Sequence, residues 1–386
     1  MKKEEIKDIP KIMLHEHLEG SITPETARKI ANKHNIEFPA DLVYAEGEYN
    51  TDEFPYGRYN YKTFMEFIGT YDKISSLLIE PEDFYIITKD LIEREVKNNL
   101  KYMEIIIYPE IMFNIKMTNE VAIEDNRYKA ILENITKAIK ECEENYDVVV
   151  KLIATGVRHM PVSRMVETAK YVLENKNDLF VGFGIASNEN AGEFSDYNEV
   201  HKLIEESNLE KSYHAGEVRD SQSIKDALEA GSKRIGHGIS IINDPELIEE
   251  VASKQILLEV SPTSNKILVE NLDYKYENHP IRKIYDAGVK LCLNTDDSGM
   301  FGTDLQKEYE ICNKYFDFSR VELFDISLNG IEEAFADELT KERIIKDIYL
   351  EFSDDDILEL KHLSENATNK HLKARLSRRY QEAASL

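Results

Sequence analysis

The sequence has few cysteines, no tryptophan and no long apolar run. Three cysteines, Cys142, Cys292 and Cys312, are spread over 386 residues. This spacing excludes a disulfide framework and a thiolate zinc site, and it is typical of reduced thiols in a cytoplasmic protein. No apolar run approaches the roughly 20 residues that cross a bilayer, and residues 1–8 lack the apolar core of a secretory signal. We therefore expect a cytoplasmic protein without a membrane partner.

Basic residues are also scarce. The chain has 48 lysines and arginines against 74 aspartates and glutamates, a formal net charge of −26. Because nucleic acids are polyanions, this excess argues against a nucleic-acid partner and favours a small, weakly charged substrate. No G-x-G-x-x-G fingerprint follows the first strand-like segment, so a dinucleotide site on an open sheet is disfavoured. No linker or repeat divides the chain, and we expect a single domain over residues 1–386.

Short apolar segments alternate with segments of helical periodicity through most of the chain. They predict parallel strands buried on both faces, and eight of them predict closure into a (β/α)8 TIM barrel. Such a barrel takes roughly 250 residues, so we expect extra helices after the first strand and a helical C-terminal extension from about residue 317. The first strand carries His15 and His17, and the others are expected at 101–108, 147–154, 179–186, 211–217, 234–239, 256–260 and 291–297.

Histidines mark the ends of several of these strands. His15 and His17 are one residue apart, so on a strand both side chains face the same way. A catalytic zinc needs at least three protein ligands and an open position for water. His214, His237 and the pair Asp296-Asp297 close later strands. Active sites of TIM barrels lie at the C-terminal strand ends, so these side chains should converge there.

His15, His17, His214 and Asp296 together form a set of three imidazoles and one carboxylate. This set suits Zn²⁺, and it does not exclude iron, cobalt or manganese. Glu217 follows His214 by three residues and is better placed as a general acid or base than as a fifth ligand; a helix-capping carboxylate is the alternative. His237 lies between two glycines and either orients or deprotonates the attacking water, or is an ordinary core histidine.

Five motifs taken together resemble the adenosine deaminase family of metal-dependent purine aminohydrolases, which act on a cyclic amidine. They occur in the family's order and span most of the chain. The motifs are His15-Glu16-His17-Leu18-Glu19-Gly20-Ser21, His214-Ala215-Gly216-Glu217, Arg234-Ile235-Gly236-His237-Gly238, Leu258-Glu259-Val260-Ser261-Pro262-Thr263-Ser264-Asn265 and Leu293-Asn294-Thr295-Asp296-Asp297.

The resemblance implies one Zn²⁺ per chain, bound by the set of three histidines and one aspartate named above. It also implies that Glu217 protonates the purine N1, that His237 positions the hydroxide for attack on C6, and that Asp297 holds N7. Gly184 would correspond to the stretch whose backbone meets the purine, and Glu19 to the carboxylate that faces the ribose.

The departures from the family pattern concern the substrate. Nucleoside deaminases of the family usually have aspartate where this chain has Glu19, and a D-L-A-G-like run at residues 184–187. Relatives acting on free adenine also carry glutamate there, but their D-S-S-E run is matched only partly by residues 186–189. We therefore expect deamination of adenosine or deoxyadenosine, with adenine or another 6-aminopurine derivative as the alternative. Ser298 replaces the usual proline and Ser261 the usual cysteine.

Other classes of protein fit the sequence less well. A two-metal amidohydrolase generally bridges its metals with a lysine on strand four, and residues 179–186 contain none. Nucleic-acid deaminases use an H-x-E and P-C-x-x-C zinc site, and this chain contains no C-x-x-C. A non-catalytic binding protein on the same scaffold is a further alternative.

Two further segments have no assigned role. The tyrosine-rich segment 40–61 is expected to be a loop that either folds over another feature or packs on the body as a surface excursion. The basic segment 373–380 is expected to be a frayed end rather than an interaction element. The sequence gives no indication of the oligomeric state.

Overall fold

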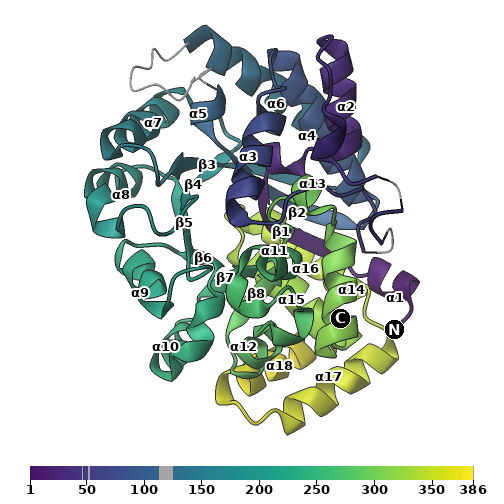
Figure 1. The fold of residues 1–386 in the computed structure, drawn as a ribbon. Coiled ribbons are helices and arrows are strands. Elements are labelled where there is room, and N and C mark those ends of the chain that lie inside the picture. Colours follow the sequence, from purple (N-terminus) through teal and green to yellow (C-terminus); the bar gives the residue numbers. More distant parts are fainter. Residues whose placement is uncertain (46, 51–52, 113–124, 386) are drawn as a thin grey trace.

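The computed structural model describes residues 1–386 except 46, 51–52, 113–124 and 386. It contains one sheet of eight parallel strands in the order β1 to β8, with helices between them (Figure 1), which confirms the predicted (β/α)8 barrel. The strands are β1 Lys11–His17, β2 Leu100–Ile107, β3 Val149–Val157, β4 Phe180–Ala186, β5 Glu210–Ala215, β6 Arg234–His237, β7 Leu257–Val260 and β8 Lys290–Leu293.

The barrel closes where β8 meets β1. A single parallel bridge joins Glu16 to Asp296. Around it, the backbone N–H of His17 donates to the carbonyl of Asp296 at 2.7 Å, and the N–H of Asp296 donates to the carbonyl of His15 at 3.1 Å. The seam of the barrel therefore runs through three of the four predicted metal ligands.

Helices surround the strands, and α7 to α10 follow one another along the left of Figure 1. Their ends follow local sequence signals. For example, the Thr23 hydroxyl accepts the N–H of Thr26 at 3.2 Å, and Pro24 occupies the first turn of α2, where no N–H is needed. No helix in the described part of the chain is long and apolar enough to cross a bilayer.

The α-helices are α1 Lys3–Lys7, α2 Pro24–Lys33, α3 Phe64–Ser75, α4 Pro81–Val96, α5 Pro109–Met112, α6 Asp125–Asn145, α7 Val162–Asn175, α8 Asn198–Glu205, α9 Ser221–Glu229, α10 Pro245–Ser253, α11 Pro262–Leu268, α12 Ile281–Asp286, α13 Ser298–Phe301, α14 Leu305–Phe316, α15 Arg320–Glu333, α16 Glu338–Leu350, α17 Asp354–Asn366 and α18 Lys370–Ala383. Short 3-10 turns include η1 Glu19–Ser21, η2 Ala40–Leu42, η3 Phe194–Tyr197 and η4 Ile239–Asn243. The helical periodicity of the sequence also predicts a helix over about residues 117–144, and its start lies outside the described residues.

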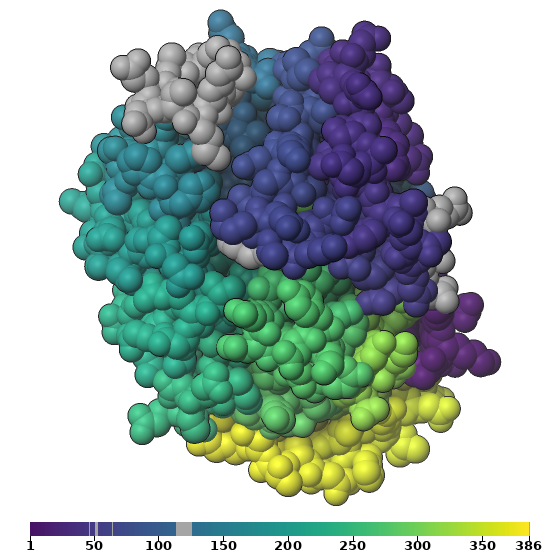
Figure 2. All heavy atoms as spheres, viewed as in Figure 1, coloured from purple at the N-terminus to yellow at the C-terminus, as the bar shows by residue number. Residues whose placement is uncertain are grey.

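The C-terminal helices are firmly attached, so the prediction of a frayed end is wrong. α15 packs against both β8 and β1, the two strands of the seam. Arg375 and Arg379 of α18 are buried, and both donate to the Asp325 carboxylate, at 2.9 and 3.1 Å. Breaking such a buried pair costs about 3–5 kcal/mol. Figure 2 shows α17 and α18, in yellow, along the lower edge of the molecule.

The tyrosine-rich segment packs onto the barrel end near α3. The Tyr59 hydroxyl donates to the carbonyl of Ile22 at 3.0 Å, and the Tyr61 hydroxyl donates to the carbonyl of Met300 at 2.9 Å. The Tyr61 ring also contacts Phe67 of α3. The sequence left open whether this segment folds over another feature or packs on the body of the protein, and the structure shows that it packs on the body. It thereby supports α3, a helix that borders the cavity described next.

Candidate metal centre and substrate cavity

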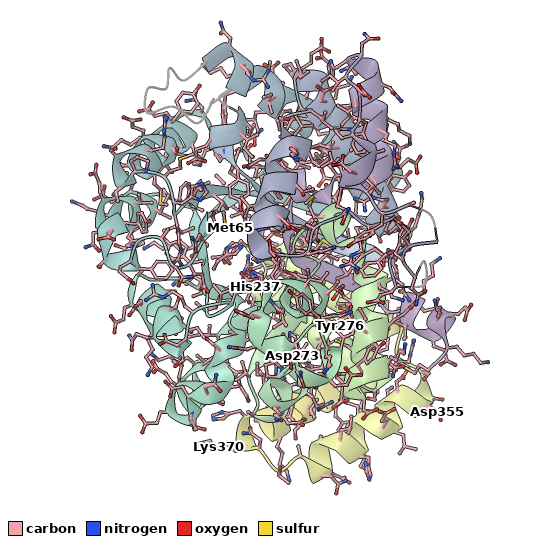
Figure 3. All side chains as sticks on the ribbon, in the orientation of Figure 1. Met65, His237, Asp273, Tyr276, Asp355 and Lys370 are labelled. Carbon is pink, nitrogen blue, oxygen red and sulfur yellow. The ribbon has the colours of Figure 1, made fainter. Side chains whose placement is uncertain are left out.

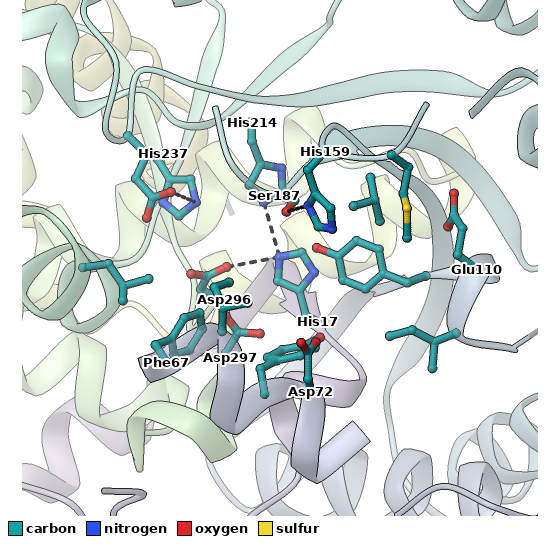
Figure 4. Close-up of a pocket in the computed structure, with 18 residues that line it drawn as sticks. His17, Phe67, Asp72, Glu110, His159, Ser187, His214, His237, Asp296 and Asp297 are labelled. Carbon is teal, nitrogen blue, oxygen red and sulfur yellow. Dashed lines mark hydrogen bonds and ion pairs between the residues drawn. The ribbon is translucent and has the colours of Figure 1, made fainter. Parts of the chain in front are cut away.

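A cavity of about 180 Å³ opens at the C-terminal ends of the strands. α3 contributes Phe67, Ile68, Tyr71 and Asp72 to one wall, while the strand ends contribute His17, His214 and His237 together with Asp296 and Asp297. Figure 4 shows these side chains facing one another across the cavity. Figure 3 places His237 near the middle of the view, away from Asp355 and Lys370 near its lower edge. The histidine and aspartate side chains at the strand ends therefore converge on one cavity, as we predicted from the sequence.

The four predicted metal ligands lie together. His15 and His17 extend from β1, His214 from β5, and Asp296 follows β8. Asp296 Oδ1 lies 3.3 Å from His15 Nε2 and 3.2 Å from His17 Nε2, and the Nε2 atoms of His17 and His214 are 3.3 Å apart. All four residues are buried. Three imidazole nitrogens and a carboxylate oxygen converging on one point form a donor set that Zn²⁺ takes, so the residues fit the ion.

His237 is a possible alternative to His17 in this set. The potential ligand atoms of His15, His214, His237 and Asp296 all lie within 4.8 Å of one another. We favour His17, because its Nε2 makes the close contacts to Asp296 and His214 given above. His237 Nε2 instead faces Glu217 Oε2 at 3.7 Å. His237, the last residue of β6, and Asp296, three residues after the end of β8, both have φ of +65°, in the left-handed region.

A buried ion-pair network orients His15. Its Nδ1 lies 2.8 Å from Glu259 Oε2, so the ring donates there and its Nε2 is free for a metal. Arg234 Nε donates to Glu259 at 2.6 Å, and Ser212 Oγ donates to it at 2.8 Å. Although burial opposes ionisation, the Arg234 guanidinium and the bond from His15 lower the pKa of Glu259 to about 2. Glu259 is thus a permanent anion behind the metal ligand.

Glu217 and Asp297 approach the same cavity from different loops. Burial, reinforced by the Asp296 carboxylate, raises the pKa of Glu217 well above its ordinary value, which favours the protonated carboxyl that a proton donor needs. Asp297 Oδ1 is buried and accepts no hydrogen bond from the described residues. A Cβ on Gly20 would lie 1.7 Å from that oxygen, so only glycine leaves room for Asp297 to enter the site.

Gly184 and Glu19, which we predicted beside the substrate, do not line the cavity. Gly184 lies within β4, where a Cβ would lie 2.5 Å from Thr155 Oγ1, so its small size serves packing between strands. The residue that reaches the cavity is Ser187, three positions later, with φ of +79°. Its hydroxyl lies 2.8 Å from His159 Nδ1. Glu19 is in η1, and burial raises its pKa to about 8.

Glu189 is the last residue of the run 186–189 that partly matches D-S-S-E, and we assigned it no role of its own from the sequence. Its buried Oε2 accepts the backbone N–H groups of Glu217, Val218 and Arg219 at 3.1, 2.7 and 2.9 Å. It therefore fixes the loop that carries Glu217. Tyr108, at the end of β2, was also missed; its ring stacks on His17 at 5.2 Å. The signal for Tyr108 was its position next to the strand-ending Pro109, and the signal for Glu189 was its place at the end of the partly matching run 186–189.

Comparisons with known proteins agree with this geometry. The family model described as adenosine deaminase matches residues 10–351. An adenine deaminase of Rhizobium rhizogenes is 32% identical over 338 residues, covering 87% of this chain and 98% of the relative. The crystal structure of an adenine deaminase from Arthrobacter aurescens is 25% identical with a TM-score of 0.77, covering 88% of this chain and 98% of the other. A zinc-bound amidohydrolase from Burkholderia ambifaria shares the fold at 20% identity, with a TM-score of 0.78 and coverage of 94% and 95%.

Proposed function

The chain belongs to the adenosine deaminase family, and we propose that it is a zinc-dependent adenine deaminase. Deamination of a purine follows from the family and from the relatives that match nearly the whole chain. The substrate differs from the nucleoside that the sequence motifs favoured. The observation that carries the proposal is the 32% identity to an adenine deaminase over 87% of this chain.

The cavity supports a free base as the substrate. Its volume of about 180 Å³ is below the roughly 300–1,000 Å³ of pockets for drug-sized ligands. Ser187 brings a side chain to a backbone position of positive φ, where a glycine would leave more space.

Each cavity residue has a defined task in this reaction. His15, His17, His214 and Asp296 would hold Zn²⁺, which lowers the pKa of a bound water to about 7. Glu217 donates its proton to the purine N1, which makes C6 electron-poor, and Asp297 holds the N7 edge. His237 positions the attacking oxygen. An oxygen–C6 bond forms and the C6–N6 bond breaks. Of the two protons that the water loses, one leaves with N6 as ammonia and the other restores the proton on Glu217, so adenine and water give hypoxanthine and ammonia.

The test compares substrates with zinc-loaded protein in an ultraviolet absorbance assay. We expect kcat/KM for adenine to exceed the values for adenosine and deoxyadenosine roughly 100-fold or more. The matched control is Glu217→Gln, which keeps the shape of the site and excludes a contaminating deaminase. Equal turnover of adenosine and adenine would contradict the preference for the free base and support the nucleoside as a substrate. The absence of turnover with every 6-aminopurine tested would overturn the proposed function.

A further inference from the structure

A chain of three hydrogen bonds connects His237 to the first turn of a helix on the far side of its ring. His237 Nδ1 lies 3.1 Å from Asn265 Nδ2, and Asn265 Oδ1 lies 3.2 Å from His279 Nε2. His279 Nδ1 accepts the backbone N–H of Ile281 at 3.1 Å. Asn265 belongs to α11, and Ile281 is the first residue of α12. All three side chains are buried, with exposed fractions of 0–5%.

The backbone sets the direction of every bond in this chain. A peptide N–H is always a donor, so His279 Nδ1 must accept and cannot carry a hydrogen. The hydrogen of a neutral His279 is therefore on Nε2, which donates to Asn265 Oδ1. The amide nitrogen of Asn265 then faces His237 and donates to its Nδ1. The hydrogen of a neutral His237 is left on Nε2, the atom that faces the cavity.

The opposite direction would need two buried donors to face each other. If Asn265 turned its oxygen toward His237, its amide nitrogen would face His279 Nε2, which would have to accept. His279 would then carry its hydrogen on Nδ1, against the N–H of Ile281. A doubly protonated His279 meets the same conflict. Burial also lowers the pKa of His279 to about 3, which keeps the ring neutral.

We propose that Asn265 and His279 are positioning residues that hold the hydrogen of His237 on Nε2, so that His237 donates a hydrogen bond to the attacking oxygen rather than taking a proton from it. The tautomer follows from the contacts alone, and only the role of the attacking oxygen rests on the proposed function. We call this chain of three hydrogen bonds the relay. The N–H that sets its direction belongs to the α12 backbone, so a side-chain substitution can interrupt the relay but cannot remove that donor. Figure 4 shows His237 directed into the cavity beside Asp296.

The first experiment reads the tautomer directly. The zinc-loaded full chain is prepared with histidine labelled with ¹⁵N in the ring, and the His237 signals are assigned by their loss in His237→Asn. We expect the hydrogen on Nε2 in the wild type. In Asn265→Asp the carboxylate can only accept, so the hydrogen should move to Nδ1. A wild-type His237 with its hydrogen on Nδ1, or an unchanged tautomer in Asn265→Asp, would overturn the inference. This readout is independent of turnover, so it stands apart from a failure of the proposed function.

The second experiment separates positioning from packing. His279→Leu removes the relay, whereas His279→Gln can offer an oxygen to Ile281 and an N–H to Asn265. With adenine as substrate we expect kcat to fall roughly 100-fold in Asn265→Asp and His279→Leu, with KM changed by less than about 3-fold. His279→Gln should recover most of the kcat. Phe316→Leu, which alters a ring 5.7 Å from that of His279, is the packing control and should behave as wild type.

The pattern across the variants decides the outcome. Equal losses in His279→Gln and His279→Leu, or a loss in Phe316→Leu as large as in His279→Leu, would show that His279 acts through packing and would overturn the relay. Metal content and thermal unfolding are measured for each variant. If a variant does not fold, the wild-type tautomer measurement still decides.

Discussion

Removing the carboxylate of Glu189 tests how the catalytic loop is built. Its Oε2 accepts three consecutive backbone N–H groups, those of residues 217–219, at 2.7–3.1 Å, and its Oε1 accepts the Ser223 hydroxyl at 3.2 Å. The carboxylate itself is 1% exposed. In Glu189→Ala these three N–H groups lose their acceptor, and the loop that begins with Glu217 loses its anchor.

The size of the effect follows from these contacts. A hydrogen bond to a charged group contributes about 1.5–3 kcal/mol. The three N–H groups are partly exposed, so the lower value applies, and we expect Glu189→Ala to lower the free energy of unfolding by about 4 kcal/mol. A displacement of Glu217 by about 1 Å should reduce kcat roughly 100-fold. Glu189→Gln keeps one acceptor oxygen but loses the charge, so about half of the stability loss and a roughly 10-fold fall in kcat are expected.

Urea unfolding at neutral pH and steady-state kinetics with adenine measure both effects on the same preparations. Metal content is determined in parallel, because Glu189 does not contact the metal ligands and its loss should leave metal binding intact. A Glu189→Ala variant within about 1 kcal/mol of the wild type in free energy of unfolding and within about twofold in kcat would show that this carboxylate does not anchor the loop of Glu217.

Three further substitutions test the site. Glu217→Gln removes the proton donor, so kcat should fall roughly 100-fold or more with metal retained; unchanged turnover would show that another group donates. Glu259→Gln removes the anion behind His15 and should weaken Zn²⁺ affinity roughly 10- to 100-fold in a chelator competition; equal affinity would contradict this. Burial raises the folded-state pKa of Glu19 to about 8, so the folded state binds more protons than the unfolded state between pH 4.5 and 8, and its stability falls as pH rises through that range. The stability gained in Glu19→Gln, measured by urea unfolding, should therefore grow from pH 5 to pH 8, and a constant gain would count against it.

The architecture and the convergence of the candidate metal ligands could be predicted because they depend on local patterns. Parallel strands buried on both faces appear in the sequence as short apolar runs, and β2 ends in the run Ile105–Ile107 with all three residues at most 4% exposed. Histidines and aspartates at the ends of such runs must meet, because the carboxyl ends of all barrel strands share one face. His214 and Asp296 are 82 residues apart and still converge for this reason.

Residues whose role depends on distant partners could not be predicted. In the sequence, the basic segment in α18 has the pattern of a solvated chain end. In the structure, Arg375 of this segment donates to Asp325, which lies 50 residues earlier in the chain. The family resemblance placed Gly184 beside the substrate, but the group that a Cβ at this position would meet is the Thr155 side chain of the neighbouring strand. The residue that turns into the cavity, Ser187, is set by where β4 ends and by its positive φ, which the sequence does not encode locally.

The seam between β8 and β1 links the fold to the chemistry. Glu16 and Asp296 form the one bridge across it in the described part of the chain, and the Glu16 carboxylate accepts the backbone N–H of Ser298 at 3.0 Å. A proline at position 298 would lack this donor. The Asp296 side chain reaches the imidazoles of the same two histidines that its backbone bonds. A cation held there would clamp the two strands whose pairing is sparsest, and because an ion that binds only the folded chain stabilises it, barrel closure and metal binding are thermodynamically linked.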